Sequence, residues 1–341
     1  MIIVMAPGAS EKQVQEVLAR LEVRGYGHNI SAGVERTIIG AIGANEREKQ
    51  QVAEQLSQLP GVERVVPILK PFKMVSRDHH PKGTIVKIGE AMFGPGHCGI
   101  IAGPCTVETE KQLMDATKAV KAAGAHVLRG GAFKPRSSPY DFQGLREEGL
   151  ELLAKAGKEF GMPTITEAME SRQIEAVANV CDAIQIGARN MSNFDLLREA
   201  GATGKTIVLK RGFAATVEEW LKAAEYVATT GNLNIILCER GIRSFDTITR
   251  FTLDLAGMAA AKLETHLPII VDPSHATGTH KLVAPMSLAA VAAGADGLMI
   301  EVHPHPDQAR CDGPQSLTPK RFSVLMDQLR EMAKLMETSI D

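Results

Sequence analysis

The stretch CDAIQIGARNMSNFDLLREAGATGKTIVLKRG, residues 181–212, decides the fold. It opens with a short β-branched run, Ala183–Ile186, and ends on a second one, Thr206–Leu209. A helical pattern fills about residues 192–200 between them. A strand, a helix and a second strand in this order are typical of a parallel sheet whose strands are joined by crossover helices.

The same unit repeats along most of the chain. Eight such runs, each followed by a helical pattern, predict an α/β fold of the (β/α)8, or TIM, barrel type. An open doubly wound sheet would usually carry a glycine-rich first turn, and GPCTVE at 103–108 lacks that fingerprint. A strand at Thr84–Ile88 is expected to form a hairpin that plugs one end of the barrel. The predicted strands are Gly99–Ala102, Ala125–Leu128, Thr164–Thr166, Ala183–Ile186, Thr206–Leu209, Asn234–Cys238, Ile269–Val271 and Gly297–Ile300, and the predicted helices lie at about 109–123, 143–160, 170–179, 192–200, 216–230, 246–263, 280–293 and 319–337.

The first 69 residues follow a different pattern. Their order is βαββαβ, which predicts a small ferredoxin-like α+β domain at 1–69. Ser10 is expected to cap its first helix. No residue cluster here is typical of catalysis, so the domain is read either as a docking unit or as a small-molecule sensor. A polar linker is expected at 70–82, where His79 and His80 read as solvated, and the barrel at 83–341.

Composition excludes several classes of protein. The chain has 341 residues, 44% hydrophobic and 23% charged, which are ordinary globular values and argue against disorder. A net charge of −2 and an aromatic content of 4% argue against a nucleic-acid-binding protein. The longest uncharged apolar stretch, 282–295, is too short to cross a membrane.

The cysteines and the N-terminus indicate the compartment. Five cysteines form no CxxC pair, and their odd number does not suggest a disulfide framework. The N-terminal MIIVMAPGAS carries no basic segment before its short apolar run, so no signal peptide is expected. These features predict a reduced, cytoplasmic protein.

Charged residues follow the predicted barrel strands at their carboxyl ends, where barrel enzymes place their chemistry. Several cations around one mouth would repel each other unless anions fill it, so phosphorylated or carboxylated substrates are expected. Part of this set is expected to pair with Glu167 and Glu239 instead. In KPRSSP, Arg136 can fork onto a phosphate, and the Ser137 and Ser138 hydroxyls can add donors. The cations are Arg129, Lys134, Arg136, Arg189, Lys210, Arg211 and Arg240.

A second group of side chains is typical of a metal site. Cys105, His275, Glu301 and Asp312 follow strands 1, 7 and 8, which are neighbours in a closed barrel. A thiolate, an imidazole and two carboxylates suit a divalent first-row metal. Cys105 alone would read as an inert residue or a nucleophile, but the nearby His275 and carboxylates favour metal ligation. His303 and His305 are competing candidates.

These motifs resemble those of a known enzyme family in matching order over about residues 75–338. They are GPCTVE (103–108), LRGGAFKPRSSPY (128–140), QIGARNM (185–191), LKRG (209–212), CERGIR (238–243), DPSHATG (272–278) and MIEVHPHP (299–306). The chain thus resembles the 3-deoxy-D-arabino-heptulosonate 7-phosphate (DAHP) synthases, and residues 1–69 resemble the regulatory domain of their type Iβ subclass. The resemblance implies condensation of phosphoenolpyruvate (PEP) with erythrose 4-phosphate, which opens the shikimate pathway.

The resemblance also implies roles for residues. Lys134 would protonate the forming hydroxyl, and Glu167 would orient the attacking water. Cys311, beside a ligand, is less expected and would make the site more sensitive to oxidation. Cys105, His275, Glu301 and Asp312 match the ligands of a divalent metal ion of the Mn, Co, Fe or Zn type, whereas Arg129, Lys134, Ala188, Arg189, Lys210 and Arg240 match the PEP contacts, and Lys134, Pro135, Arg136 and Ser137 match the aldose-phosphate motif.

Two other functions fit these motifs less well. A 3-deoxy-D-manno-octulosonate 8-phosphate synthase, which uses arabinose 5-phosphate, typically carries Lys-Ala-Asn-Arg-Ser where this chain has Lys134-Pro135-Arg136-Ser137. A non-catalytic amino-acid sensor would not need the charged rim of the barrel. The family further implies a homotetramer and a Tyr or Phe effector.

Overall fold

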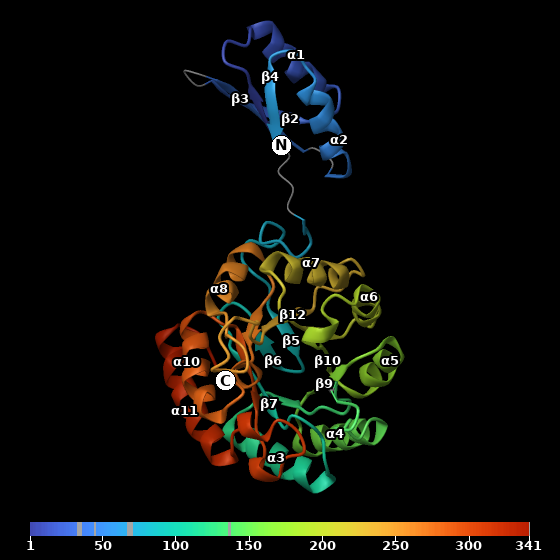
Figure 1. Cartoon of the computed structure of the whole chain (residues 1–341), viewed down its shortest axis with the longest axis vertical. Coiled ribbons are helices and arrows are strands. Elements are labelled where there is room, and N and C mark those ends of the chain that lie inside the picture. The colour runs from blue at the N-terminus through green and yellow to red at the C-terminus, as the bar shows by residue number, and fades with distance from the viewer. Residues whose placement is uncertain (33–35, 44–45, 67–70, 136–137, 341) are drawn as a thin grey trace. The chain divides into compact units, whose positions relative to one another are not determined.

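The computed structural model describes residues 1–32, 36–43, 46–66, 71–135 and 138–340 (Figure 1). The chain divides into two compact units, Met1–Pro71 and Phe72–Asp341. Each unit has its own hydrophobic core and is described by itself. Among the described residues, no helix combines the length and the apolar character that a membrane crossing requires.

The first unit is a four-stranded antiparallel sheet with two helices, as predicted. Its strand order is β2-β3-β1-β4, the ferredoxin-like arrangement. Ser10 caps the first helix in a capping box with Gln13, and Ile3, Leu21 and Ile39 are fully buried in the core. The elements are β1 (Ile2–Met5), α1 (Glu11–Glu22), β2 (Gly27–Ala32), β3 (Thr37–Ile42), α2 (Glu46–Ser57) and β4 (Val62–Val66).

The second unit is a closed barrel of eight parallel strands surrounded by helices, which confirms the predicted fold class (Figure 1). The barrel closes where β14 pairs with β7, with Glu301 opposite Gly103. Its strands are β7 (Gly99–Gly103), β8 (Val127–Arg129), β9 (Thr164–Ala168), β10 (Ala183–Ile186), β11 (Thr206–Lys210), β12 (Ile235–Glu239), β13 (Ile269–Val271) and β14 (Gly297–Glu301). Its helices are α3 (Glu110–Ala123), α4 (Glu147–Phe160), α5 (Ser171–Val180), α6 (Phe194–Ala202), α7 (Val217–Ala228), α8 (Leu255–Glu264), α9 (Pro273–Thr277), α10 (His280–Ala292) and α11 (Pro319–Leu335).

The expected plug is present as a hairpin of β5 (Val86–Ile88) and β6 (Ala91–Phe93). Its buried Val86, Ile88 and Phe93 share a hydrophobic cluster with inward-facing residues of the barrel strands. Thr206, the first residue of β11, donates from Oγ1 to Lys87 O in β5, so the hairpin packs at the amino-terminal end of the strands. The carboxyl ends of the strands, at the opposite end of the barrel, remain open for an active site.

The helix expected at 246–263 begins only at Leu255, where Asp254 caps it by accepting from the Gly257 N–H. The preceding residues form a loop instead of a helix. Their backbone N–H groups have distant partners: Arg250 donates to Thr277 O and Phe251 to Ala276 O. These bonds to α9 hold the segment in a looped path that a helix could not follow.

The barrel unit begins at Phe72, within the stretch 70–82 that was expected to be a linker. Phe72 and Val75 are buried in the barrel core, and the Glu225 carboxylate accepts from three consecutive backbone N–H groups that begin at Lys73. His79 and His80 are exposed, and both rings contact the His266 ring.

Candidate active site

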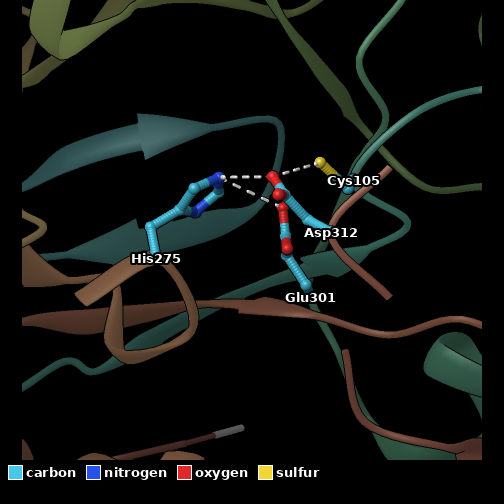
Figure 2. A group of neighbouring side chains, drawn as sticks. All are labelled: Cys105, His275, Glu301 and Asp312. Atoms are coloured by element: carbon cyan, nitrogen blue, oxygen red, sulfur yellow. Dashed lines mark hydrogen bonds and ion pairs between the residues drawn. The ribbon is translucent and has the colours of Figure 1, made fainter. Parts of the chain in front are cut away.

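The carboxyl ends of the strands bring four predicted ligands together (Figure 2). Cys105 follows β7, His275 lies in α9 after β13, Glu301 ends β14, and Asp312 lies in the loop that follows. Each offers one ligand atom, and these atoms all lie within 4.8 Å of one another. Figure 2 shows the His275 ring facing both carboxylates, with the Cys105 sulfur beside Asp312.

Asp272 fixes the orientation of the His275 imidazole. It caps α9 by accepting from the His275 backbone N–H, and its carboxylate lies 2.7 Å from His275 Nδ1. A proton held at Nδ1 leaves the lone pair on Nε2, which lies 3.3 Å from Glu301 Oε1 and 3.9 Å from Asp312 Oδ2. Burial lowers the pKa of His275, so the ring is neutral near pH 7 and able to act as a ligand.

The two carboxylates stay ionised although burial opposes their charge. His275 and Arg129 hold the pKa of Glu301 below its ordinary value, and His275 and Arg250 do the same for the pKa of Asp312. Asp312 also adopts a φ of 52°, in the left-handed region that non-glycine residues rarely enter. The backbone is therefore held in an uncommon conformation where the side chain serves the site.

The thiol of Cys105 completes the group. Its sulfur lies 3.3 Å from Asp312 Oδ2, 3.0 Å from Lys134 Nζ and 3.5 Å from the Cys311 sulfur. The hydrogen bond with Cys311 and burial raise the pKa of Cys105 well above its ordinary value. One sulfur, one imidazole nitrogen and two carboxylate oxygens around a common point fit a first-row divalent cation, whose binding would displace the thiol proton.

Three of the predicted cations form buried ion pairs. Arg129 Nη1 lies 2.9 Å from Glu301 Oε1, and Lys210 Nζ lies 2.5 Å from Asp272 Oδ2. Arg211 Nη1 lies 3.1 Å from Glu239, the pairing expected for this acid, and 2.8 Å from Asp254. The other acid, Glu167, accepts from Gln185 Nε2 at 2.9 Å. Arg211 is thereby committed to structure rather than to an incoming anion.

A cavity at the barrel mouth adjoins the ligand cluster. Its lining includes the predicted PEP contacts Lys134, Ala188, Arg189, Lys210 and Arg240, the predicted water-orienting Glu167, and Pro135 of the aldose-phosphate motif. The sixth predicted PEP contact, Arg129, is not among the lining residues. His275 and Asp312 line the same cavity, so ligand-type and cationic residues share one space. Arg136 and Ser137 lie outside the described residues.

Sequence reasoning assigned no role to the residues that hold the ligands in place. Gln315 Nε2 donates to Glu301 Oε2 at 2.6 Å, and Arg250 Nη1 contacts Gln315 Oε1 at 2.8 Å and Asp312 Oδ1 at 3.3 Å. The Asp-Pro start of DPSHATG was a readable helix-capping signal for Asp272. The competing His303 faces Glu108 instead, with 3.6 Å between Nε2 and Oε2, and His305 is exposed.

Comparisons with known proteins agree with this geometry. Residues 80–338 match the DAHP synthetase I family, and residues 1–70 match the DAHP synthase ferredoxin-like domain. The chain is 46% identical to phospho-2-dehydro-3-deoxyheptonate aldolase of Thermotoga maritima over 341 residues, 100% of each chain. The crystal structure of the Thermotoga maritima aldolase (DAHP synthase) superimposes with a TM-score of 0.80, at 46% identity, over 99% of this chain and 98% of that one.

Two further matches cover only part of the chain. The chain is 33% identical to 2-dehydro-3-deoxyphosphooctonate aldolase of Magnetococcus marinus over 254 residues, which are 69% of this chain and 88% of that one. A truncated form of the Thermotoga maritima synthase superimposes with a TM-score of 0.74, at 45% identity, over 79% of this chain and 99% of that one.

Proposed function

The chain belongs to the DAHP synthetase I family, and from this premise we propose how its own residues perform the family reaction. It is a DAHP synthase, which condenses PEP with erythrose 4-phosphate and water to give DAHP and phosphate at the start of the shikimate pathway. The observation that carries the assignment of residues is the shared cavity, where four ligand-type side chains adjoin several cations.

We propose that Cys105, His275, Glu301 and Asp312 hold a divalent cation of the Mn, Co, Fe or Zn class. The supporting observation is the buried donor set, with His275 Nε2 turned toward both carboxylates. When bound, the cation supplies Lewis-acid polarisation of the aldehyde oxygen. Asp272 keeps the imidazole in the ligating tautomer, and Gln315 keeps Glu301 in place.

We propose that cations at the barrel mouth bind PEP and align its C3 with the aldehyde carbon of erythrose 4-phosphate. Arg129, Lys134, Ala188, Arg189, Lys210 and Arg240 would contact PEP, and Pro135, Arg136 and Ser137 would contact the aldose phosphate. Holding the two reactants together lowers the entropic cost of forming the carbon–carbon bond. Two anionic substrates require several positive charges in one place.

We propose that Glu167 assists water addition and that Lys134 transfers a proton. The bond from C3 of PEP to the aldehyde carbon leaves positive character at C2, where water adds with Glu167 orienting it. Lys134 protonates the new hydroxyl. Burial opposes its charge, but the neighbouring Cys105 and Cys311 sulfurs raise the pKa of Lys134 above its ordinary value, so it carries a proton to give. The hemiketal phosphate at C2 then loses phosphate.

The direct test is phosphate release from PEP with each aldose phosphate. We expect turnover with erythrose 4-phosphate and little with arabinose 5-phosphate. Preference for arabinose 5-phosphate would instead identify a 3-deoxy-D-manno-octulosonate 8-phosphate synthase. Release of phosphate with neither aldose would favour the non-catalytic sensor.

Arg136→Ala is expected to raise KM for erythrose 4-phosphate roughly 10- to 100-fold while KM for PEP changes little, because a lost charge-assisted contact to phosphate weakens only the substrate that it binds. Steady-state kinetics with each substrate varied in turn measure the split. Arg198→Ala, at an exposed ion pair on α6, is the matched control. Equal increases in both KM values would show that Arg136 is not an aldose-phosphate ligand.

We further propose that the ferredoxin-like unit is regulatory, that Tyr or Phe is its effector, and that the enzyme is a cytoplasmic homotetramer. The match of residues 1–70 to the ferredoxin-like domain of DAHP synthases supports the regulatory role. The metal-type cluster found among the described residues lies wholly in the barrel. An effector regulates only if it binds one domain arrangement better than another.

Residues 70–341 expressed alone are expected to be active and insensitive to Tyr and Phe, whereas the full chain is inhibited by one of them. The barrel has its own core, and the Thermotoga maritima synthase has been solved in a truncated form. Activity titrations of both forms with each amino acid give the measurement. Lack of any effect on the full chain would exclude feedback by Tyr or Phe through this unit.

A further inference from the structure

Arg240 differs from the other buried arginines of the barrel mouth. Arg129 pairs with Glu301, and Arg211 pairs with two carboxylates. Arg240 is 4% exposed, yet its Nη1 has no hydrogen-bond partner among the described residues. A buried cation without an acid is costly unless another group stabilises its charge.

Two aromatic rings stand where an acid would be expected. The Arg240 guanidinium carbon lies 4.8 Å from the centroid of the Phe213 ring and 4.2 Å from that of Phe251. The two rings stack on each other, with 5.1 Å between centroids and an interplanar angle of 8°. The negative face of an aromatic ring attracts a guanidinium without taking up its N–H groups.

The rings are held by backbone contacts between two loops. Phe213 follows β11 and Phe251 follows β12, and both line the cavity. The Arg243 N–H donates to Phe213 O, and the Phe251 N–H donates to Ala276 O in α9. The aromatic pair is thus fixed relative to the helix that carries His275.

The Phe213 ring contacts two further cations besides Arg240. The guanidinium carbon of Arg189 lies 5.4 Å from the Phe213 centroid. That of Arg243 also lies 5.4 Å from it. Arg189 and Arg240 line the cavity, so Phe213 stabilises two like charges there as well as Arg243. A carboxylate in the position of Phe213 would neutralise them and compete with an incoming anion.

We propose that Phe213 and Phe251 are positioning residues that keep Arg240 charged, oriented and free of acidic partners, so that its N–H groups are available to an anionic group of PEP. This inference rests on the proposed contact between Arg240 and PEP. The role explains why Arg240 has aromatic neighbours in place of a carboxylate. Burial lowers the pKa of Arg240 to about 10, which leaves the group charged at neutral pH.

The test compares PEP binding in variants of the full-length enzyme. Phe251→Leu is expected to raise the Kd and KM of PEP roughly 3- to 30-fold, because it removes the ring face, whereas Phe251→Tyr retains the face and restores most of the affinity. KM for erythrose 4-phosphate should change less than about twofold, since the aldose phosphate is assigned to other residues. Phe194→Leu, in a stacked pair with Tyr226 outside this cavity, is the matched control and should leave PEP binding unchanged.

A second measurement separates electrostatics from packing. Fluorinated phenylalanines introduced at position 251 keep the shape of the ring and weaken its negative face stepwise, so PEP affinity should fall with each added fluorine. A merely structural ring would show no such trend. Equal PEP affinity across the fluorinated series and in Phe251→Leu would overturn the proposal.

Arg240→Ala distinguishes failure of this inference from failure of the proposed contact. Unchanged PEP affinity in Arg240→Ala would refute the contact itself. Weakened affinity in Arg240→Ala together with unaffected phenylalanine variants would refute only the role of the rings. If both proposals hold, Phe251→Leu should have no further effect on PEP affinity in the Arg240→Ala background.

Discussion

Cys105→Ala is expected to remove the bound metal and to lower kcat by roughly a thousandfold or more, because the variant loses the only sulfur donor of the proposed ligand set. The sulfur also lies 3.0 Å from Lys134 Nζ, so the proposed proton donor loses a neighbour. Elemental analysis and steady-state kinetics on the same preparation measure both losses. Chelation of the unaltered enzyme should likewise abolish activity, and Mn or Co should restore it.

The control for this substitution is Cys181→Ala, at the buried cysteine that directly follows α5. Cys181→Ala creates a cavity of similar size in the core and should leave both metal content and turnover close to their original values. Full activity after exhaustive chelation, with no residual metal by elemental analysis, would refute the metal assignment.

Asp272→Asn is expected to weaken metal binding roughly 10- to 100-fold, because the carboxylate fixes the tautomer of the ligand His275. The same change should lower the free energy of unfolding by about 3–5 kcal/mol, since Lys210 becomes a buried cation without its acid. Asp272 is fully buried and lies 2.7 Å from His275 Nδ1 and 2.5 Å from Lys210 Nζ. A metal titration of folded protein and a denaturant curve separate the two effects.

The pH dependence of stability gives a further check on Asp272. Burial opposes its charge, but His275 and Lys210 hold the pKa of Asp272 well below its ordinary value. A lowered carboxyl pKa stabilises the fold above about pH 4, and this contribution is lost as the pH falls further. Asp272→Asn should therefore make the free energy of unfolding depend less on pH below about pH 4, whereas Asp195→Asn, at an exposed ion pair, should not.

The metal titration also tests the role of Asp272 beside His275. An unchanged metal affinity in Asp272→Asn would contradict the proposal that Asp272 positions the imidazole.

The sequence was sufficient to predict the barrel, because each strand–helix unit carries its own pattern of β-branched and helical residues. It was also sufficient to predict that the four proposed ligands lie close together, since strands 1 and 8 must be neighbours once eight parallel strands close. The start of α8 could not be predicted in this way. The loop before it is shaped by hydrogen bonds from Arg250 and Phe251 to α9, more than twenty residues away in sequence.

The sequence also could not predict which cations pair with acids and which remain available. Lys210 and Arg211 are adjacent in LKRG, yet one contacts Asp272 and the other Glu239 and Asp254. Their side chains point to different surroundings because successive residues of an extended chain face opposite sides. The aromatic neighbours of Arg240 come from two separate loops, and no spacing along the chain brings Phe213 and Phe251 together.

The closure of the barrel between β14 and β7 affects when the nascent chain can assemble the proposed metal site. Glu301 pairs opposite Gly103 across this seam, so two of the four proposed ligands, Cys105 and Glu301, lie on either side of it. During synthesis, Cys105 is made nearly two hundred residues before Glu301. Domains fold as units once their last elements are available. Capture of the proposed metal ion is therefore expected only after the last strand and Asp312 have been synthesised and the barrel has closed.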